Sequence, residues 1–559
     1  MNRISRDFRP WTLVIVTALL ATPCRAASDS SAEKYLEAAR RFADVVVERG
    51  RDVYGEQAGP LFVDGLHATT LAPATWKKGG ETWVLSNFAS QQPLLRLLDG
   101  LTAMTGEPEY RRAAEEAARC ALEKLRTPNG MLYWGGHLAW DLDRDKPVGQ
   151  GTLVHELKNH QPHYRLMWRV DPAATRRLLE TIWATHVVDW TLLDYNRHAN
   201  AGKEARPRWD HAFDEGVDVP FPTRGSNLSF ANVTPPLMHA GAMLAVLGDD
   251  GGALLWTRRL ARRWQQARHP ATGLSGGQLS YREQDRAQEA LGHVHPQINE
   301  AMIVATYHQS SRYHTLPLAQ MQAAESLLES GGERRPVGRA LLDWASDDLK
   351  TYARRCYDPA AGEFPARMTD GTLIRWKEST TGYYVPESFA PLAPDGFLLW
   401  GYCLAYRLTR DDEHWQTART LAERLGLGDL GDPEGAGRDL NLRTSADDWR
   451  LIYALIELDA ACQRTGLLDL AARVADNALA LQSDTGLFPR PGREYARTGD
   501  EIPLALLHLA AAIEGKRDLL PRAAFDRRFF HCEHDEPLQP HQRKRADART
   551  YDHYVHYGQ

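Results

Sequence analysis

The chain has 559 residues and a formal net charge of −6 at pH 7, with 67 Lys and Arg against 73 Asp and Glu. This acidic balance argues against a nucleic-acid partner, because proteins bind nucleic acid through a basic surface. It also means that an acidic substrate must meet a local basic cleft, since the overall field of the protein repels it.

Residues 1–26 have the three-part form of an export signal. Three arginines precede an apolar run over residues 11–20, and the segment ends at Ala26. The run has about half the length that a bilayer span needs. The sequence therefore predicts a cleavable signal peptide and a soluble, periplasmic or secreted protein with no membrane partner. Removing these residues takes away four Arg and one Asp, so the formal charge falls from −6 to −9.

Helical hairpins recur along the rest of the chain. One helix closes at Gly106 and the next is predicted over residues 107 to about 125; another hairpin turns at Gly466, before a helix predicted over residues 468 to about 481. Glycine terminates a helix in the left-handed conformation, and proline cannot continue one. Strands are scarce, so the pattern predicts an all-α fold, an α/α toroid of helical hairpins with few short strands in loops.

No low-complexity linker divides this region. We therefore expect a single α/α-barrel domain over residues 27–525, with (α/α)7 as the expected number of hairpins. The last residues, 526–559, are rich in charge, His and Tyr, and a polar tail packed on the surface is the prediction for them.

The first loop with candidate chemistry covers residues 131–137. It holds the ring pair Tyr133 and Trp134, a Gly-Gly pair and His137, a potential metal ligand. An aromatic ring in such a loop can stack on the face of a sugar, and we predict substrate contact for Trp134. Packing in the core is the alternative for any single aromatic residue in a helical protein.

The next segment, residues 155–160, has the residue types of a metalloprotease helix at the wrong spacing. His155 and His160 are five residues apart, which turns the second side chain about 140° away from the first on a helix. Glu156, His160 and His163 would share one helical face and form a rival metal site. Pro162 weakens that alternative, because it interrupts the helix.

Asp194, Tyr195, Asn196, Arg197 and His198 follow downstream. The adjacent Arg and His put a fixed cation beside a metal-binding imidazole. An enzyme that acts on an acidic sugar needs this pairing, so the stretch indicates a metal-assisted polyuronate lyase.

His137, Glu156 and the pair Arg197-His198, in this order and with these intervals, resemble the family 2 polysaccharide lyases, which are pectate lyases of Gram-negative bacteria. The resemblance covers essentially the whole chain after the signal. It implies a catalytic α/α barrel in which His137, Glu156 and His198 hold a metal and Arg197 is the Brønsted base. His155 competes with His137 for the role of first ligand.

The resemblance also implies a divalent transition metal, with Mn first and Co or Ni as alternatives, whereas most pectate lyases use calcium. Ligand chemistry agrees, since calcium prefers an all-oxygen shell and two imidazoles with one carboxylate suit borderline metals. The expected substrate is 1,4-linked galacturonate, as polygalacturonate or its oligosaccharides. Its C5 hydrogen is α to a carboxylate, so its removal leads to β-elimination and an unsaturated product once the added negative charge is offset.

Arginine is ordinarily protonated, so its use as a base rests on the family. In the alternative, Arg197 clamps a substrate carboxylate and Lys158 or Lys203 is the base. Further substrate contacts are predicted at Arg208, Tyr281 and Arg282.

No exposed apolar stripe is evident in the sequence, so we expect a monomer.

Two other function classes remain open. One is an inverting glycoside hydrolase, which needs paired carboxyl groups and has Asp141, Asp143 and Glu378 in loops to supply them. The other is a non-catalytic oligouronide-binding protein, which would share the cations and have no need of a Lewis acid.

Overall fold

The protein is described here from a computed structural model. The structure describes residues 29–149, 151, 154–157, 160–223, 229–283, 286–304, 311–376, 389–462, 466–524, 530 and 532. The predicted signal peptide and most of the predicted tail therefore lie outside the described residues.

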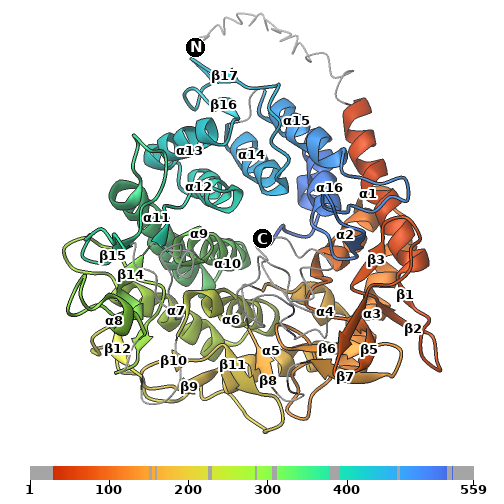
Figure 1. Cartoon of the computed structure of the whole chain (residues 1–559), viewed down its shortest axis with the longest axis horizontal. Helices are drawn as coiled ribbons and strands as arrows, with labels where there is room; N and C mark the ends of the chain where they lie inside the picture. The colour runs from red at the N-terminus through yellow and green to blue at the C-terminus, as the bar shows by residue number, and fades with distance from the viewer. Residues whose placement is uncertain are drawn as a thin grey trace, which may run out of the picture.

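Helices arranged in a ring form the body of the molecule (Figure 1). The inner helices are α2 (Gln92–Thr105), α4 (Tyr164–Val170), α6 (Thr234–Gly248), α10 (Leu316–Ser330), α12 (Gly396–Thr409), α14 (Trp449–Cys462) and α16 (Ile502–Ile513). Each packs against an outer helix: α3 (Pro108–Lys124), α5 (Pro172–His186), α7 (Gly251–Gln266), α11 (Arg334–Cys356), α13 (Asp412–Arg424), α15 (Leu467–Leu479) and α1 (Asp29–Arg49).

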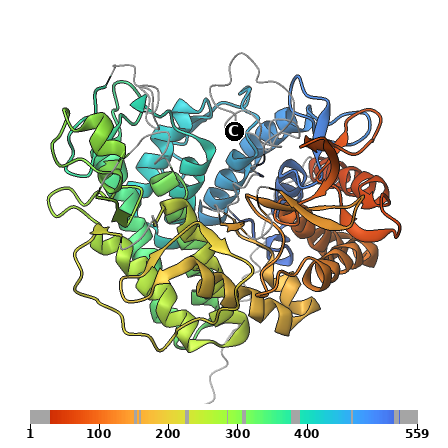
Figure 2. The same cartoon turned by 60° about the horizontal axis from the view of Figure 1, so that its bottom comes forward.

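The first described helix closes the ring, because α1 packs against α16 near the other end of the sequence. Within the described residues the helices thus form seven pairs, and the predicted all-α toroid of helical hairpins is confirmed. Figure 2 shows the same ring tilted, with the helices of neighbouring hairpins side by side.

Burial distinguishes the inner helices from the outer ones. In α12 every residue from Gly396 to Tyr406 is buried, because this helix packs between the inner helices α10 and α14 and against its outer partner α13. In α3 the buried residues, among them Tyr110, Ala113, Ala117 and Ala121, recur every three or four positions. That spacing gives an outer helix one apolar face and leaves the opposite face to water.

The hairpin turns follow the predicted glycine and proline positions. Gly106 ends α2 with φ 81° and donates its N–H to the Thr102 carbonyl, and α3 then begins at Pro108. Gly466 also has a positive φ, 94°, and α15 begins at the next residue. Both predicted helices are present within a few residues of their expected ends.

The strands are short and lie in the connections between helices, as predicted. One sheet has four strands, β4 (Thr75–Lys78), β5 (Glu81–Ser86), β6 (Leu138–Asp141) and β7 (Lys146–Gly149). The pairs that bear on the site are β8 (Val154–Glu156) with β11 (His198–Asn200), β9 (Val187–Asp189) with β10 (Asp194–Tyr195), and β12 (Phe221–Pro222) with β13 (Ser280–Tyr281).

The other pairs are β1 (Arg51–Asp52) with β2 (Gly59–Phe62), β3 (Gly65–His67) with β18 (Tyr495–Arg497), β14 (Ile303–Val304) with β15 (Arg367–Met368), and β16 (Gly428–Asp429) with β17 (Asp439–Leu440). Short helical turns complete the described elements: η1 (Ala231–Val233), α8 (Arg286–Leu291), η2 (Glu300–Met302), α9 (Ser311–His314) and η4 (Arg517–Leu519).

The described part of the predicted tail is apolar and buried. Phe530 and Cys532 pack with Trp76, Trp83 and Leu85 of the four-stranded sheet. The C-terminal segment thus contributes to the packing of this sheet at these two positions.

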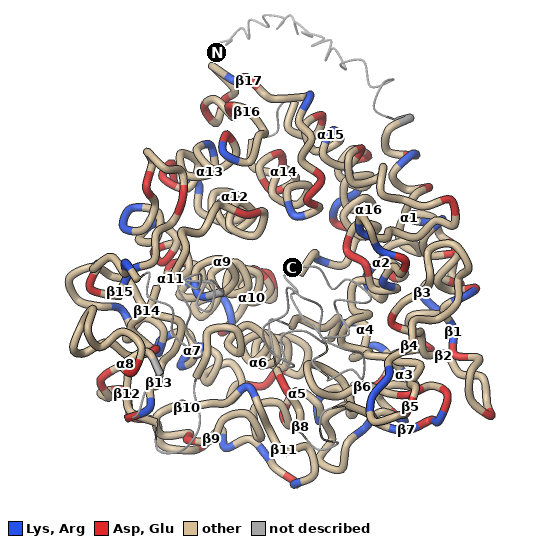
Figure 3. The backbone as a smooth tube through the Cα atoms, in the orientation of Figure 1, with Lys and Arg blue, Asp and Glu red and all other residues tan. Residues whose placement is uncertain are grey.

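Charged residues of both signs occur around the ring. Lys and Arg residues are interspersed with Asp and Glu around the ring (Figure 3). Among the described helices, none combines the length and the apolar character that a membrane crossing requires.

Candidate metal centre

The site is built on the antiparallel pair of β8 and β11. His198 lies opposite Glu156, and Ala199 lies opposite His155. Side chains of directly opposed residues point to the same face of a strand pair, and successive residues alternate between faces. Glu156 and His198 therefore share one face, while His155 points to the other.

His137 completes a cluster on the first of these faces. Its Nε2 lies 3.1 Å from His198 Nε2 and 3.3 Å from Glu156 Oε2, and His198 Nε2 lies 3.4 Å from Glu156 Oε1. The Glu156 side chain is 1% exposed, whereas the His198 side chain is 37% exposed. The carboxylate thus forms the floor of the cluster, and an imidazole lies at its open side.

The glycine pair before His137 allows this approach. A Cβ at position 136 would lie 1.9 Å from Glu156 Oε2, and a Cβ at position 135 would lie 2.8 Å from the Glu156 carbonyl oxygen. Gly135 also has φ 97°, which disfavours any side chain. The two glycines are needed for the close contact of this loop with Glu156.

Arg197 lies beside the same carboxylate. Its Nε is 3.5 Å from Glu156 Oε1, and its guanidinium carbon is 5.4 Å from the centre of the Phe230 ring. The backbone is also fixed here, because the Leu157 N–H donates to the Arg197 carbonyl. The Arg197 side chain remains 35% exposed, so a molecule from solvent can reach it.

The donor set fits a divalent transition metal. His137, Glu156 and His198 each offer one ligand atom, and these atoms lie within 4.8 Å of one another. Within the described residues this is the only group of three or more His, Cys, Asp or Glu side chains so arranged. Two imidazole nitrogens and a carboxylate suit borderline metals such as Mn, Co or Ni better than calcium.

His155, the competing first ligand, is engaged elsewhere. It is fully buried on the opposite face of β8, where its Nε2 accepts from Trp134 Nε1 at 2.9 Å and its Nδ1 lies 2.9 Å from His186 Nε2. Burial lowers the pKa of His155 well below its ordinary value and lowers the pKa of His186 to about 4. With both ring nitrogens of His155 bonded, the geometry favours His137 as the first ligand.

Trp134 does not occupy the position expected for a sugar contact. It is 1% exposed, stacks against Phe88, and donates its indole N–H to His155. Core packing, the alternative interpretation, describes it correctly. Its indole N–H nevertheless bonds His155, which lies in the strand that carries Glu156.

The rival metal set is wrong because the helix it assumed does not form. Glu156 lies in β8, and His163 precedes α4, where its Nε2 bonds Asp99 Oδ2 at 3.0 Å. His160 packs edge-on against Trp134. The three side chains therefore share no common face.

Two of the carboxyl groups considered for a hydrolase, Asp141 and Asp143, lie within the described residues, and Asp143 is exposed. Asp141 is fully buried in β6 and accepts hydrogen bonds from the backbone N–H groups of Val84 and Asp143. Burial raises its pKa. Glu378 lies outside the described residues.

Of the two lysines considered as alternative bases, Lys158 also lies outside the described residues, and Lys203 is exposed in the loop after β11.

The other predicted substrate contacts lie on two separate segments of the chain. Tyr281 and Arg282 follow Ser280, whose hydroxyl donates to Asp194 at 3.0 Å, so β13 is tied to the strand that leads to Arg197. Tyr281 is partly exposed and Arg282 exposed. Arg208 is exposed next to Trp209, whose side chain lies against Gly252 in α7.

Sequence reasoning missed two residues that support the site. His186, the last residue of α5, lies with its Nδ1 2.7 Å from the Asn196 carbonyl oxygen, and the Asn196 side chain accepts from the His198 N–H at 3.0 Å. The position of Asn196 directly before Arg197 was an available signal. His186 gave none, because it falls among the buried positions of an ordinary helix.

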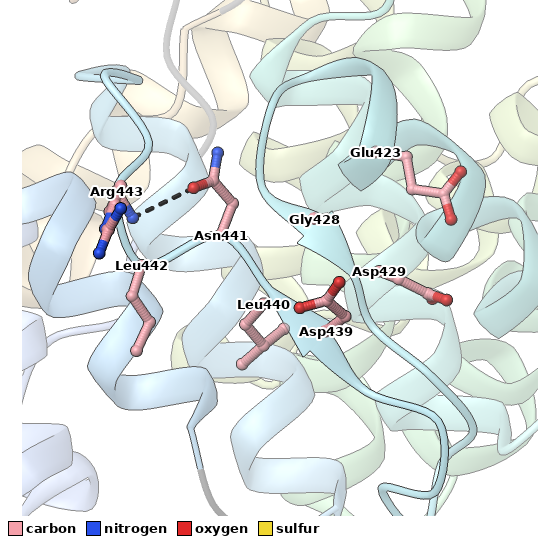
Figure 4. A pocket seen from close by; sticks show the side chains of 8 residues that line it. All are labelled: Glu423, Gly428, Asp429, Asp439, Leu440, Asn441, Leu442 and Arg443. Atoms are coloured by element: carbon pink, nitrogen blue, oxygen red, sulfur yellow. Dashed lines mark hydrogen bonds between the residues drawn. The ribbon is translucent and has the colours of Figure 1, made fainter.

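A hollow away from the metal cluster lies beside the β16–β17 hairpin (Figure 4). It is lined by Glu423, Gly428, Asp429, Asp439, Leu440, Asn441, Leu442 and Arg443. Figure 1 places it across the ring from β8 and β11. Its Asp429 is ion-paired with Arg419, so this hollow has no evident part in the chemistry of the cluster.

Solved structures with related architecture are distant from this chain. A cellobiose 2-epimerase from Spirochaeta thermophila DSM 6192 is 15% identical with a TM-score of 0.42, covering 80% of this chain and 98% of that one. A GH76 α-mannanase from Bacteroides thetaiotaomicron is 10% identical with a TM-score of 0.40, covering 88% and 99%. Neither is close enough to inform the site.

Sequence relatives are more informative. The chain is 27% identical over 531 residues to a pectate disaccharide-lyase from Dickeya dadantii strain 3937, covering 89% of this chain and 93% of that protein. The family described as periplasmic pectate lyase matches residues 59–533. This match spans most of the chain and confirms the predicted resemblance. The chain belongs to the periplasmic pectate lyase family and is a polysaccharide lyase.

Proposed function

We propose that the protein is a metal-dependent pectate lyase that cleaves 1,4-linked galacturonate by β-elimination and leaves an unsaturated product. The observation that carries this proposal is the convergence of His137, Glu156 and His198 beside the guanidinium of Arg197. The family match and the pectate disaccharide-lyase relative support the substrate class.

The substrate poses a charge problem. Removing the C5 hydrogen adds negative charge next to a carboxylate that is already anionic. A divalent transition metal held by His137, Glu156 and His198 would supply the Lewis acidity that offsets this charge. The imidazoles contribute neutral donors and the buried Glu156 a single negative charge, so such a site keeps a net positive charge toward the substrate.

Arg197 is the proposed base. Glu156 and the ring of Phe230 fix the orientation of its guanidinium, while about a third of the side chain faces solvent. In its neutral guanidine form, Arg197 accepts the C5 proton; the C5–H electron pair forms the C4–C5 double bond, the C4–O bond breaks, and the leaving oxygen takes a proton from solvent. The N–H groups of the same guanidine can donate hydrogen bonds to the uronate carboxylate, so Arg197 orients the same sugar from which it takes the proton.

The remaining assignments extend this proposal. Mn is the favoured metal, with Co or Ni as alternatives and calcium less suitable. Arg208, Tyr281 and Arg282 are proposed contacts for an acidic polysaccharide or oligogalacturonide. The mature protein is proposed to be a monomer that is exported by its N-terminal signal.

The test is an assay of metal-stripped protein on polygalacturonate, with Mn²⁺, Ca²⁺ or no addition. Ultraviolet absorbance from the new double bond is expected with Mn²⁺ and not after chelation. New reducing ends without ultraviolet absorbance would indicate a hydrolase, and binding without either signal would indicate a non-catalytic protein. Either result would overturn the proposal.

A substitution separates chemistry from binding. Arg197→Ala is expected to lower kcat by roughly 10²–10⁴-fold, the usual loss for a general base, with Mn²⁺ affinity retained. Arg354→Ala is the matched control, because Arg354 is also ion-paired with a glutamate, Glu413, and lies on outer helix α11. Arg197→Ala with unchanged kcat would exclude Arg197 as the base.

A further inference from the structure

A line of buried hydrogen bonds runs behind the metal cluster. Trp134 Nε1 donates to His155 Nε2 at 2.9 Å, His155 Nδ1 lies 2.9 Å from His186 Nε2, and His186 Nδ1 lies 2.7 Å from the Asn196 carbonyl oxygen. Trp134 is 1% exposed, and both histidines are fully buried. Water therefore does not compete for these bonds.

The two ends of this line fix every proton along it. An indole N–H is only a donor and a carbonyl oxygen only an acceptor. His155 Nε2 must therefore accept, so its proton is on Nδ1. His186 Nδ1 must donate to Asn196, so its Nε2 accepts the proton that His155 offers. Both imidazoles are neutral and each has one defined tautomer.

Three residues of this line lie within three positions of a predicted metal ligand in the sequence. Trp134 is three residues before His137, His155 directly precedes Glu156, and Asn196 is two residues before His198. His186, at the end of α5, connects the last two segments. One hydrogen-bonded line thus ties together all three segments that carry the cluster.

The line makes its most extensive contact with the segment that carries Asn196, Arg197 and His198. His186 makes two hydrogen bonds with Asn196. Its ring Nδ1 bonds the Asn196 carbonyl oxygen, and the His186 carbonyl oxygen accepts from the Asn196 N–H at 2.9 Å. The Asn196 side chain in turn accepts from the His198 N–H at 3.0 Å. A displacement of the His186 ring would therefore shift the backbone from which Arg197 and His198 project.

We propose that His155 and His186, with Trp134 as the terminal donor, are positioning residues that hold the three ligand segments and Arg197 in register for metal binding and catalysis. This inference rests on the proposed function for the identity of the reaction. The line contacts neither metal nor substrate, and it acts by fixing the backbone and strand positions behind them.

Three substitutions test the proposal. His186→Phe keeps a ring and removes both side-chain hydrogen bonds. His186→Gln can restore them in the same sense, because its amide oxygen accepts and its amide N–H donates. Trp134→Phe removes the terminal donor and part of the ring volume but leaves both His186 hydrogen bonds in place, so it is the milder variant if His186→Phe fails to fold.

The matched control is His414→Phe. His414 is also fully buried, bonds Ser346 Oγ through Nε2 at 2.7 Å, and lies on outer helix α13. It should lower the melting temperature without changing the cluster. A purely structural role for His186 would give the same result as His414.

The readouts are Mn²⁺ affinity by calorimetry on the purified full chain, melting temperature, and kcat and KM on polygalacturonate. His186→Phe is expected to weaken Mn²⁺ binding by roughly 10- to 100-fold, Trp134→Phe by less, and His186→Gln to recover part of the loss. A folded His186→Phe or Trp134→Phe protein with wild-type Mn²⁺ affinity and kcat would overturn the proposal.

Failure of the proposed function would give different results from failure of the positioning role. If the wild-type chain binds no Mn²⁺, the metal assignment is wrong whatever the variants do. The positioning role is then decided by kcat alone, which should fall in His186→Phe and stay unchanged in His414→Phe. Equal kcat in both variants would exclude the positioning role.

Discussion

His198 lies directly opposite Glu156 in the β8–β11 pair, with Nε2 3.4 Å from Oε1. Because side chains alternate between the faces of a strand, a slip of one residue would place Ala199 or Arg197 opposite the carboxylate. The imidazole would then face the wrong side. The register of a three-residue strand pair thus determines whether the cluster exists.

Substituting Glu156 should remove the metal and leave the fold intact. Glu156→Gln keeps the size of the side chain and replaces the charged donor with a neutral amide. Mn²⁺ affinity is expected to fall by on the order of 100-fold or more, beyond the loss usual for residues that only support a ligand. Calorimetry on the metal-stripped protein measures this change. Glu413→Gln, which removes the ion pair with Arg354 on the outer ring, should leave the affinity unchanged.

The glycine before His137 should tolerate no side chain. In Gly136→Ala the new Cβ would lie 1.9 Å from Glu156 Oε2, so the loop or the carboxylate must move. We expect a loss of about 1–3 kcal/mol in the free energy of unfolding and weaker Mn²⁺ binding. Denaturant unfolding and metal titration measure the two effects.

Gly251→Ala is the control for that substitution, since no atom beyond the chain neighbours and the backbone of its own helix lies within 4 Å of a Cβ at the start of α7. It should be neutral or slightly stabilising, because alanine favours a helix over glycine. Wild-type Mn²⁺ binding in Gly136→Ala would show that the cluster does not depend on the close approach of this loop.

The helical hairpins could be predicted because their turns have local causes. Gly106 and Gly466 adopt positive φ, and Pro108 begins a helix wherever the surrounding chain goes. The three proposed ligands came from the resemblance, since residue spacing alone also allowed the set with His160 and His163. That set failed because residues 154–156 form a strand too short to show a period in sequence.

Side-chain burial was the part that sequence could not supply. An aromatic residue in a glycine-rich loop has the same pattern whether it faces a sugar or the core. Trp134 is buried because Phe88 and His155 occupy its ring face and its N–H, and both lie far from it in the chain. The connection from His186 to Asn196 is likewise a tertiary contact between a helix end and a strand.

Substrate contacts outside the cluster should affect binding more than chemistry. Arg282→Ala and Arg208→Ala are each expected to raise KM on polygalacturonate a few-fold with little change in kcat, because an interaction that is equal in ground and transition states changes only KM. Steady-state kinetics at low and high salt measure this, since screening should shrink the difference. An unchanged KM at low salt would remove that residue from the binding surface.

Buried neutral histidines should make the fold sensitive to acid. Burial lowers the pKa of His414 to about 4, and burial likewise lowers the pKa of His508 to about 4, against an ordinary value of 6.5. Below pH 6.5 the unfolded chain takes up protons that the folded chain refuses, so stability falls as the pH drops from 6.5 to 4. Below pH 4 both states bind the proton and the loss from these groups stops. His414 alone accounts for about 3 kcal/mol over this range.

His414→Gln tests the sign and the size of this effect, because glutamine does not titrate and can still bond Ser346. The free energy of unfolding, measured by denaturant at several pH values on metal-free protein, should rise with pH between 4 and 6.5 less steeply than in the wild type. The slope should fall by up to about 1.4 kcal/mol per pH unit, the contribution of one proton. Above pH 6.5 the two slopes should agree, since His414 is then neutral in both states. An equal slope below pH 6.5 would mean that His414 takes up its proton as readily in the folded chain as in the unfolded one.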